Sequence, residues 1–205
     1  MPRLAGQVDR AKAEAMLVAA GQVISERGFG APVEAIAKRA GVSKQTLYNH
    51  YGGKAGLITA LITRRVDQVT APLAAERVDP HPEAALAEFG RRLMETLLSP
   101  GNIALTRVAI QGAVDAPEVA KAIHEAGGVA TRGRLAAFLK AETGAGRLCV
   151  DDPAEAAELF IGMIGARQLH GLLGLPIESD GEALTRQSAV IAKRFVRAYR
   201  SRRQP

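Results

Sequence analysis

The chain has no tryptophan, one cysteine and few aromatic residues of any kind. Aromatic side chains make up 4% of its 205 residues and hydrophobic residues 47%, so the core is expected to consist of Ala, Leu, Val and Ile from closely packed helices. The single cysteine, Cys149, excludes a disulfide within the chain and fits a reducing compartment. No segment approaches the roughly 20 apolar residues of a membrane-spanning helix, and the N-terminus lacks the apolar core of a signal peptide. These absences predict a soluble, cytoplasmic protein.

Signatures of catalysis are also missing. The four histidines lie far apart and form no cluster with Cys149 at metal-ligand spacing. There is no phosphate-binding glycine loop after a strand and no G-x-S-x-G sequence. We therefore expect no metal, no cofactor and no enzymatic activity. Cys149 is interpreted as inert, with a redox sensor as the alternative.

Charge is distributed unevenly along the chain. Residues 1–65 carry 10 Lys and Arg against 4 Asp and Glu, residues 66–192 carry 11 against 17, and the last 13 residues carry 6 basic and no acidic side chains. A basic N-terminal segment on an acidic body suits a polyanionic partner at that end of the chain. Charge alone supports a polyanionic partner and an ordinary solvated surface equally well. The basic C-terminal end is interpreted as a solvated helix end. A further contact with the polyanionic partner, such as DNA, is the less favoured alternative.

The segment from Val33 to Lys54 distinguishes between these interpretations. Apolar residues at helical spacing stop at Gly41, a residue suited to the left-handed conformation at a helix end. Ser43 then stands where its hydroxyl can cap a second helix. In that helix Leu47 is the inward-facing anchor, and the remaining surface carries polar side chains. Two short helices joined by a tight turn, with a polar second helix, form the helix-turn-helix layout that places the second helix in the major groove of DNA.

The rest of the chain predicts helices and no strand. Apolar residues recur at helical spacing, without an alternating pattern, a repeat or a low-complexity tract. The sequence therefore predicts an all-α fold, with a three-helix DNA-binding domain at residues 1–53 and a regulatory and dimerisation domain at residues 54–205. Asp152 before Pro153 marks a helix start, and Gly127-Gly128 can kink or split a helix. About nine helices are expected: one over 9–27, two within 33–53, and six over 54–73, which connects the domains, 83–98, 103–114, 117–143, 153–173 and 182–200.

Residues 9–60 resemble the DNA-binding domain of the tetracycline-repressor (TetR) family of bacterial transcription regulators. The region beyond residue 70 is similar to that family in length and helix count, and most similar to the regulatory domains of its AefR-like branch. The resemblance implies a homodimer, usually a repressor, that leaves a palindromic DNA operator when a small-molecule effector binds. The matching residues are Gly28-Phe29, Val33, Ile36-Ala37, Ala40-Gly41-Val42-Ser43, Thr46-Leu47-Tyr48, His50-Tyr51 and Lys54.

Three positions depart from the family pattern. Where the family has Thr or Ser before the second helix, this chain has Pro32, which suits a first helical turn but removes a hydroxyl that contacts a phosphate. Tyr51 stands where Phe is usual, and Gly53 stands where Ser, Asn or Asp is frequent. Glycine is an acceptable N-cap, so these changes leave the predicted fold unaltered.

Polar residues on and beside the second motif helix are the predicted DNA contacts. Lys44 and Tyr48 share one side at i, i+4 spacing and can reach phosphates or base edges, with a solvated surface as the alternative. Gln45 and Thr46 are predicted to read base edges, since a Gln amide can pair with adenine and a Thr methyl can meet a thymine methyl. For His50, a phosphate contact and a packing role both remain open. The predicted set is Lys44, Gln45, Thr46, Tyr48, Asn49, His50 and Lys54, the last as a phosphate contact.

The second domain is predicted to carry a dimer interface. The helix over 153–173 is apolar around much of its circumference, so it must be buried on more than one side. With the last helix it resembles the four-helix dimer interface of the family, and burial within the monomer core is the alternative. A two-fold dimer would present two reading helices to a palindromic operator. The predicted interface residues are Phe160, Ile164, Leu169, Leu172, Val190 and Phe195.

A ligand cavity in the second domain is implied by the resemblance. Its candidate lining residues fit an ordinary core better than a pocket when taken one by one. Three of them are polar groups on otherwise apolar helices and could orient a polar or acidic ligand. The candidates are Phe89, Leu93, Arg107, Gln111, Phe138, Met163 and Arg167.

The sequence thus predicts a homodimeric, ligand-responsive DNA-binding transcription regulator, with repression favoured over activation. Its predicted partners are an operator in double-stranded DNA, a second copy of the chain and a small-molecule effector. The rival interpretation is a protein–protein adaptor that kept the fold and lost its operator. The basic first 65 residues speak against the adaptor.

Overall fold

The computed structural model is helical, and its described residues contain no β-strand. The only strand-like pairing among them is a single antiparallel bridge between Leu148 and Arg200. The prediction of an all-α fold is confirmed. Phe29 and the tail residues Arg202 and Arg203 lie outside the described residues. The structure describes residues 5–28, 30–74, 81–115, 117–177 and 180–200.

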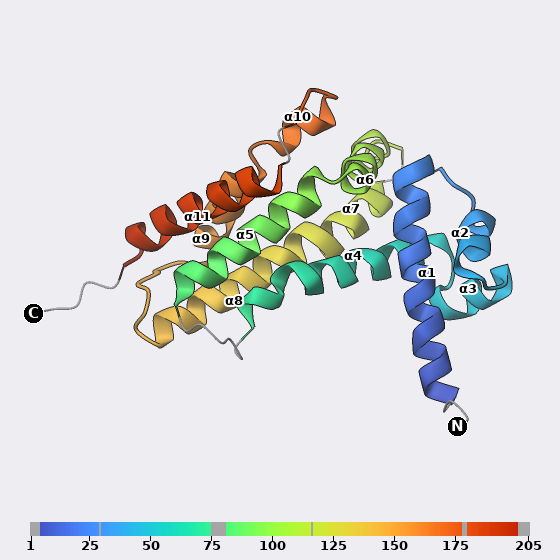
Figure 1. The fold of residues 1–205 in the computed structure, drawn as a ribbon, viewed down its shortest axis with the longest axis horizontal. Helices are drawn as coiled ribbons and strands as arrows, with labels where there is room; N and C mark the ends of the chain where they lie inside the picture. Colours follow the sequence, from blue (N-terminus) through green and yellow to red (C-terminus); the bar gives the residue numbers. More distant parts are fainter. Residues whose placement is uncertain (1–4, 29, 75–80, 116, 178–179, 201–205) are drawn as a thin grey trace, which may run out of the picture. The chain divides into compact units, whose positions relative to one another are not determined.

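The chain forms two compact units, and each of them is built from two separate segments of the sequence. Figure 1 shows the helices of both. The first unit comprises Met1–Arg64 and Pro100–Ala126, and the second comprises Arg65–Ser99 and Gly127–Pro205. One helix, α4, begins in the first unit and ends in the second. The functional boundary predicted after residue 53 is a different kind of division, and it stays a prediction.

Helices of the first unit pack around a small apolar core. Met16, Ala20 and Ile24 recur on one face of the first helix at helical spacing and are almost fully buried. Leu57 and Leu61 of α4 and several residues of the two motif helices are buried as well. The elements of this unit are α1 (Ala5–Arg27), α2 (Val33–Ala40), α3 (Lys44–Tyr51), the start of α4 (Lys54–Thr70), α6 (Pro100–Gln111) and α7 (Pro117–His124).

The second unit is built around phenylalanine side chains. Phe160 stacks on Phe89 with ring centroids 5.9 Å apart and meets Phe195 edge-on at 5.0 Å. All three rings are buried, and such pairs add to the stabilisation from burial alone. They connect three of the helices. The elements are the end of α4, a 3₁₀ turn (Ala71–Leu73), α5 (Pro82–Leu98), the end of a π-helical turn (Glu125–Val129), α8 (Ala130–Gly144), α9 (Pro153–Gly165), α10 (Gln168–Leu172) and α11 (Gly181–Ala198).

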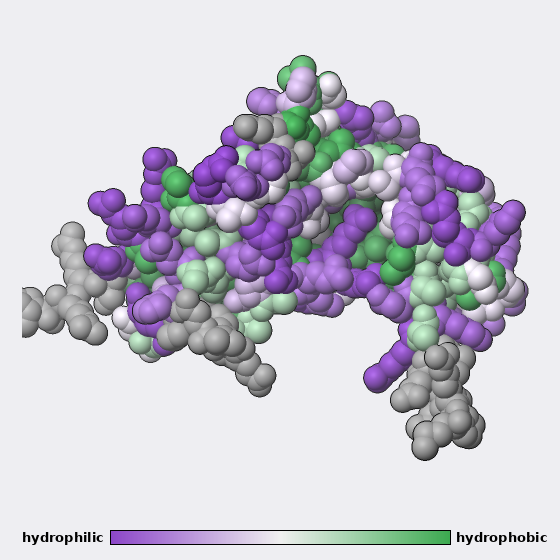
Figure 2. Space-filling model, viewed as in Figure 1, coloured by the Kyte–Doolittle hydropathy of each residue, from purple (hydrophilic) through white to green (hydrophobic). Residues whose placement is uncertain are grey.

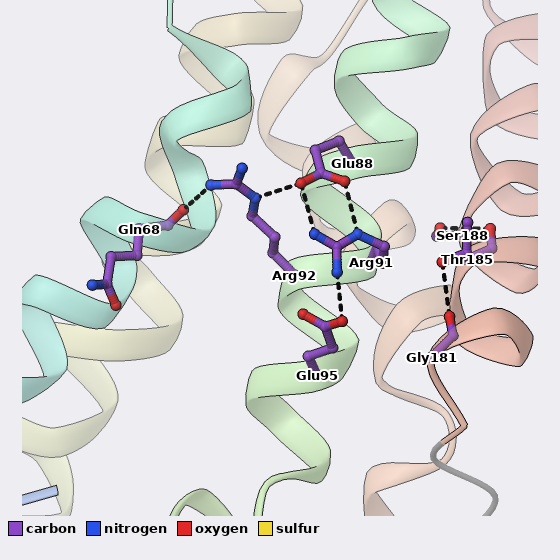
Figure 3. Close-up of polar contacts among 8 residues, drawn as sticks. All are labelled: Gln68, Glu88, Arg91, Arg92, Glu95, Gly181, Thr185 and Ser188. Atoms are coloured by element: carbon purple, nitrogen blue, oxygen red, sulfur yellow. Dashed lines mark hydrogen bonds and ion pairs between the residues drawn. The ribbon is translucent and has the colours of Figure 1, made fainter.

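A polar network joins α5 to the end of α4 within the second unit (Figure 3). Glu88 accepts hydrogen bonds from Arg91 and Arg92, and Arg92 also donates to the backbone oxygen of Gln68 at 3.0 Å. The hydrogen bond from Arg91 lowers the pKa of Glu88 to about 2, despite the opposing effect of burial. Glu88 therefore stays ionised at neutral pH and orients both guanidinium groups.

Helix ends follow local signals in most places. Asp152 caps α9 by accepting from the amides of Ala154 and Glu155, as predicted. The helix predicted over 117–143 is interrupted by a π-helical turn that contains Gly127-Gly128, the pair predicted to kink or split it, because glycine weakens the regular helix. The helix predicted over 153–173 was too long, because it ends at Gly165 and α10 follows after a turn. Within the described ranges, no helix combines the length and apolarity needed to span a bilayer.

Candidate nucleic-acid interface

A buried leucine and two caps fix α3 on the first unit. Leu47 has no exposed surface, and Ile36 and Ala37 of α2 are buried as well. Gly41 adopts the left-handed conformation with φ 68°, which turns the chain between the two helices. The Ser43 hydroxyl then accepts a hydrogen bond from the Thr46 amide at 3.0 Å. The sequence predicted each of these features, and together they hold α3 by one side.

The outer side of α3 is polar and exposed. Lys44, Gln45, Tyr48 and Asn49 are exposed. The Gln45 amide nitrogen donates to the Asn49 side-chain oxygen at 2.8 Å, so these two amides form a pair one helical turn apart. Such a pair presents both hydrogen-bond donors and acceptors to solvent. A side chain that recognises a base edge needs these groups, because base edges carry donors and acceptors themselves.

Thr46 is less available than its neighbours. It is half-buried, and its hydroxyl lies 2.8 Å from the capping hydroxyl of Ser43. Capping the helix therefore occupies the polar group of Thr46. Its methyl group remains the part suited to a thymine methyl.

Lys44 stands at the start of α3 between an acid and an aromatic ring. Its ammonium nitrogen lies 2.6 Å from the Glu34 carboxylate of α2 and 5.7 Å from the centre of the Tyr48 ring. The hydrogen bond between Lys44 and Glu34 raises the pKa of the lysine and lowers the pKa of the glutamate. Both side chains are more than half exposed, so the pair stays accessible to a competing anion.

Lys54 and His50 are half-buried beside the exposed face. The Lys54 ammonium donates to the backbone oxygen of Ala31 at 2.7 Å, and burial lowers its pKa. Lys54 thus connects the start of α4 to the loop before α2. The His50 ring lies 6.1 Å from the Tyr51 ring. Both residues have a packing role as well as the DNA contact predicted for them.

Two contacts below α3 were not predicted as determinants of the site. The Tyr51 hydroxyl donates to the backbone oxygen of Ala13 at 3.1 Å and ties α3 to α1, and burial raises the pKa of Tyr51. A phenylalanine, usual in the family, could not make this bond. A Cβ atom at Gly56 would overlap the Tyr51 carbonyl oxygen. The close approach of α4 to α3 at this position therefore requires glycine. A lone glycine early in a helix is a weak sequence signal for such an approach.

The predicted ligand residues fall in different environments. Phe89 and Leu93 are core residues of the second unit, and Arg107 and Gln111 are exposed residues of the first unit. Met163 is 40% exposed on α9, and Arg167 is half-buried in the turn before α10. Phe138 lines a depression in the second unit.

That depression lies between α8 and the end of α4 and has a volume of about 540 Å³. Arg134 of α8 spans part of it, donating to Asp67 at 2.5 Å and to the Thr70 hydroxyl at 2.8 Å. Its apolar wall includes Leu73 and Phe138. The size and the mixture of apolar surface with a few polar groups suit a small molecule. The described residues contain no group of three His, Cys, Asp or Glu side chains that could hold a metal ion.

The predicted dimer residues divide into buried and exposed ones. Phe160, Ile164 and Phe195 fill the core of their own unit, so they offer a partner almost no surface. Packing of α9 against α5 and α11 of the same chain explains this result. Leu169 and Val190 are 58% and 47% exposed, and Leu172 is half-buried. Other exposed apolar residues are Leu159 and Met163 on α9, and Leu173 and Leu175, which follow α10.

The fold and the exposed face of α3 define a helix-turn-helix protein with a helical second part. Residues 16–61 match the family described as "Bacterial regulatory proteins, tetR family". Residues 84–201, more than half of the chain, match "AefR-like transcriptional repressor, C-terminal domain". The chain belongs to the TetR family of regulators and to its AefR-like branch, as the resemblance predicted. That family is one of transcription regulators and not of enzymes.

Individual relatives agree with this assignment. The solved structure of the flavonoid-responsive regulator FrrA is 32% identical, with a TM-score of 0.64 over 93% of this chain and 98% of FrrA. A TetR transcriptional regulator from Agrobacterium tumefaciens is 26% identical, with a TM-score of 0.73 over 93% of this chain and 95% of that one. The HTH-type transcriptional regulator RutR from Escherichia coli K12 is 41% identical over 86 residues, which are 42% of this chain and 41% of RutR. The chain thus spans about two fifths of the length of the curated relatives it matches.

Proposed function

We propose that the protein is a homodimeric transcription repressor that binds a palindromic operator through α3 and leaves it when a small molecule binds. The observation that carries this proposal is α3 itself, held by buried Leu47 on one side and exposing Lys44, Gln45, Tyr48 and Asn49 on the other. Family membership supports it. In the proposal, residues 1–53 bind DNA, residues 54–205 regulate that binding, and the protein acts in the cytoplasm without enzymatic activity.

DNA binding is proposed to use the seven residues predicted from the sequence. The amides of Gln45 and Asn49 read base edges, Lys44 and Tyr48 contact the DNA at the start of α3, and the Thr46 methyl meets a base. Lys54 and His50 contact phosphates from the side while they support the fold. A single α3 per chain is a small reading surface, and a two-fold dimer doubles it.

The dimer is proposed to form through the exposed apolar residues of α9, α10 and α11. Figure 2 shows apolar surface at the α10 end of this unit. Leu159, Met163, Leu169, Leu173 and Val190 are each at least 40% exposed. Several large apolar side chains exposed on neighbouring elements mark an interaction surface more often than isolated ones do. Phe160, Ile164 and Phe195 support this surface from below.

The effector is proposed to bind in the depression beside Arg134. A ligand that takes hydrogen bonds from the Arg134 guanidinium must compete with Asp67 and Thr70, both at the end of α4. Because α4 also runs into the first unit, releasing its end offers a route from ligand to DNA. FrrA is described as flavonoid-responsive, so flavonoids are the first compounds to test.

Operator selection from random duplexes, followed by gel shifts at several salt concentrations, tests the proposed function. A selected palindrome bound more tightly than unrelated duplex is expected. Binding without any preferred sequence, lost at moderate salt, would favour the adaptor interpretation instead. Adding flavonoids to the operator complex then tests release. Arg134→Ala removes the bonds to Asp67 and Thr70 that the ligand would break, so it should weaken operator binding and abolish the response to flavonoids.

A further inference from the structure

An acidic residue lies inside the predicted DNA-binding surface of the first unit. Glu34 is in the first turn of α2, and its carboxylate lies 2.6 Å from the Lys44 ammonium at the start of α3. Exposed fractions of 55% for Lys44 and 57% for Glu34 show that solvent reaches both groups. A carboxylate so placed is unexpected on a surface that approaches phosphates, because like charges repel.

The geometry gives Glu34 the position of a phosphate relative to Lys44. Charge-assisted hydrogen bonds of a lysine to a carboxylate and to a phosphate have similar lengths. The Lys44 ammonium also lies over the Tyr48 ring, 5.7 Å from its centre. Lys44 is therefore already directed at an anion before any DNA is present.

We propose that Glu34 occupies Lys44 in the free protein and is exchanged for a DNA phosphate on binding, which lowers the affinity for every duplex. The inference rests on the proposed function, since it requires α3 to approach DNA. A lysine paired with a carboxylate neutralises no phosphate until the exchange occurs. Glu34 thus lowers the electrostatic part of the affinity for DNA, and it does so by pairing with Lys44.

The structural alternative is that Glu34 only stabilises the start of α2. Acidic side chains favour helix N-termini, and Pro32 supplies no capping side chain there. Glu34→Gln separates the two roles, because glutamine keeps an oxygen that can accept from backbone amides and loses only the charge. Glu26→Gln is the matched control, since Glu26 also forms an exposed ion pair in this unit, with Arg39 at 2.7 Å.

The test measures affinity for an unrelated duplex and for the selected operator over a range of salt concentrations. For Glu34→Gln we expect affinity for both duplexes to rise about fivefold at low salt, as for loss of one exposed ion pair. The slope of log affinity against log salt should stay nearly unchanged, because Lys44 neutralises one phosphate in both bound complexes. Glu26→Gln should change affinity by less than about twofold at the same salt, because its carboxylate does not hold Lys44. Urea unfolding of both variants monitors the stability of α2.

A double-mutant cycle decides whether the effect runs through Lys44. In a Lys44→Ala background, Glu34→Gln should change affinity by less than about twofold, because no lysine remains to be released. An equal rise in both backgrounds would overturn the inference, and so would a rise shared by Glu26→Gln. Absence of any preferred operator would instead refute the proposed function, and the cycle on unrelated duplex would still report on Glu34.

Discussion

The first unit exposes polar side chains on α3 around one buried leucine, whereas the second unit exposes apolar side chains on α9 to α11 around a core of phenylalanines. A polar face on a small, capped helix suits a charged and hydrated partner such as DNA. An apolar face on larger helices suits burial against another protein chain. The two surfaces therefore suit different kinds of partner, and each has its own packed support.

The largest effect is expected when one methyl group is added to the packing below each surface. In Gly56→Ala the new Cβ atom would meet the Tyr51 backbone oxygen, which cannot move without shifting α3. In Gly90→Ala it would meet the end of the Ile164 side chain at 2.9 Å, which can rotate away. We expect Gly56→Ala to destabilise the protein by about 3 kcal/mol or more and Gly90→Ala by about 1 kcal/mol.

Urea unfolding followed by circular dichroism measures both variants, and operator affinity measures their effect on α3. Gly56→Ala should abolish operator binding, and Gly90→Ala should leave it nearly intact. Equal stability of the two variants would show that the approach of α4 to α3 is looser than the structure indicates.

Next in size is a charge placed on the apolar face of the second unit. Leu169→Asp should weaken self-association by about 2 kcal/mol or more, as for an apolar residue near the centre of an interface. Sedimentation velocity over a concentration series gives the dissociation constant. Val18→Asp is the control, since Val18 is also exposed, at 42%, but belongs to the first unit. A dimer unaffected by Leu169→Asp would place the interface elsewhere.

On the polar face, Gln45→Ala should cost about 1–3 kcal/mol at one base position and little elsewhere. Gln45 and Asn49 are hydrogen-bonded to each other, and in the proposed readout the loss of the Gln45 amide would leave one base edge unread. Wild type and variant are compared on a set of singly substituted operators. Identical base preferences for the two proteins would remove Gln45 from the readout.

The smallest effect concerns acid stability of the second unit. The pKa of Glu88 is lowered to about 2 from 4.5 by Arg91, so its contribution is present above pH 4.5 and is lost as the pH falls towards 2. The carboxylate is 37% exposed, so we expect only about 1 kcal/mol after screening. Thermal unfolding from pH 6 to 2.5 should show this loss in wild type and not in Glu88→Gln. Glu182→Gln, which removes a more exposed pair with Arg186, should behave like wild type.

Much of the first unit was predictable because its determinants are local. Gly41 and Ser43 act on residues within about one turn, and Leu47 is the clear apolar residue of a polar helix, so local pattern alone defined the turn, the cap and the anchor. Glu34 escaped prediction because its partner, Lys44, lies on the next helix and the pairing depends on how α2 and α3 cross.

In the second unit the sequence predicted helices better than surfaces. The apolar circumference of α9 indicated burial on several sides, but Phe160 and Ile164 proved to face their own chain and Leu169 to face solvent. Periodicity identifies an apolar side chain without identifying what covers it. The split at Gly127-Gly128 was predicted from its two glycines, whereas the end of α9 at Gly165 was not.

By itself the sequence determined the all-α class, the helix-turn-helix and its polar outer face, because caps, glycines and helical periodicity are short-range properties of the chain. Only the tertiary structure decided that Lys44 is held by Glu34, that α4 passes α3 at Gly56, and which apolar residues of α9 to α11 stay exposed. These depend on distances between segments that are separate in the sequence, and such distances exist only once the helices have packed.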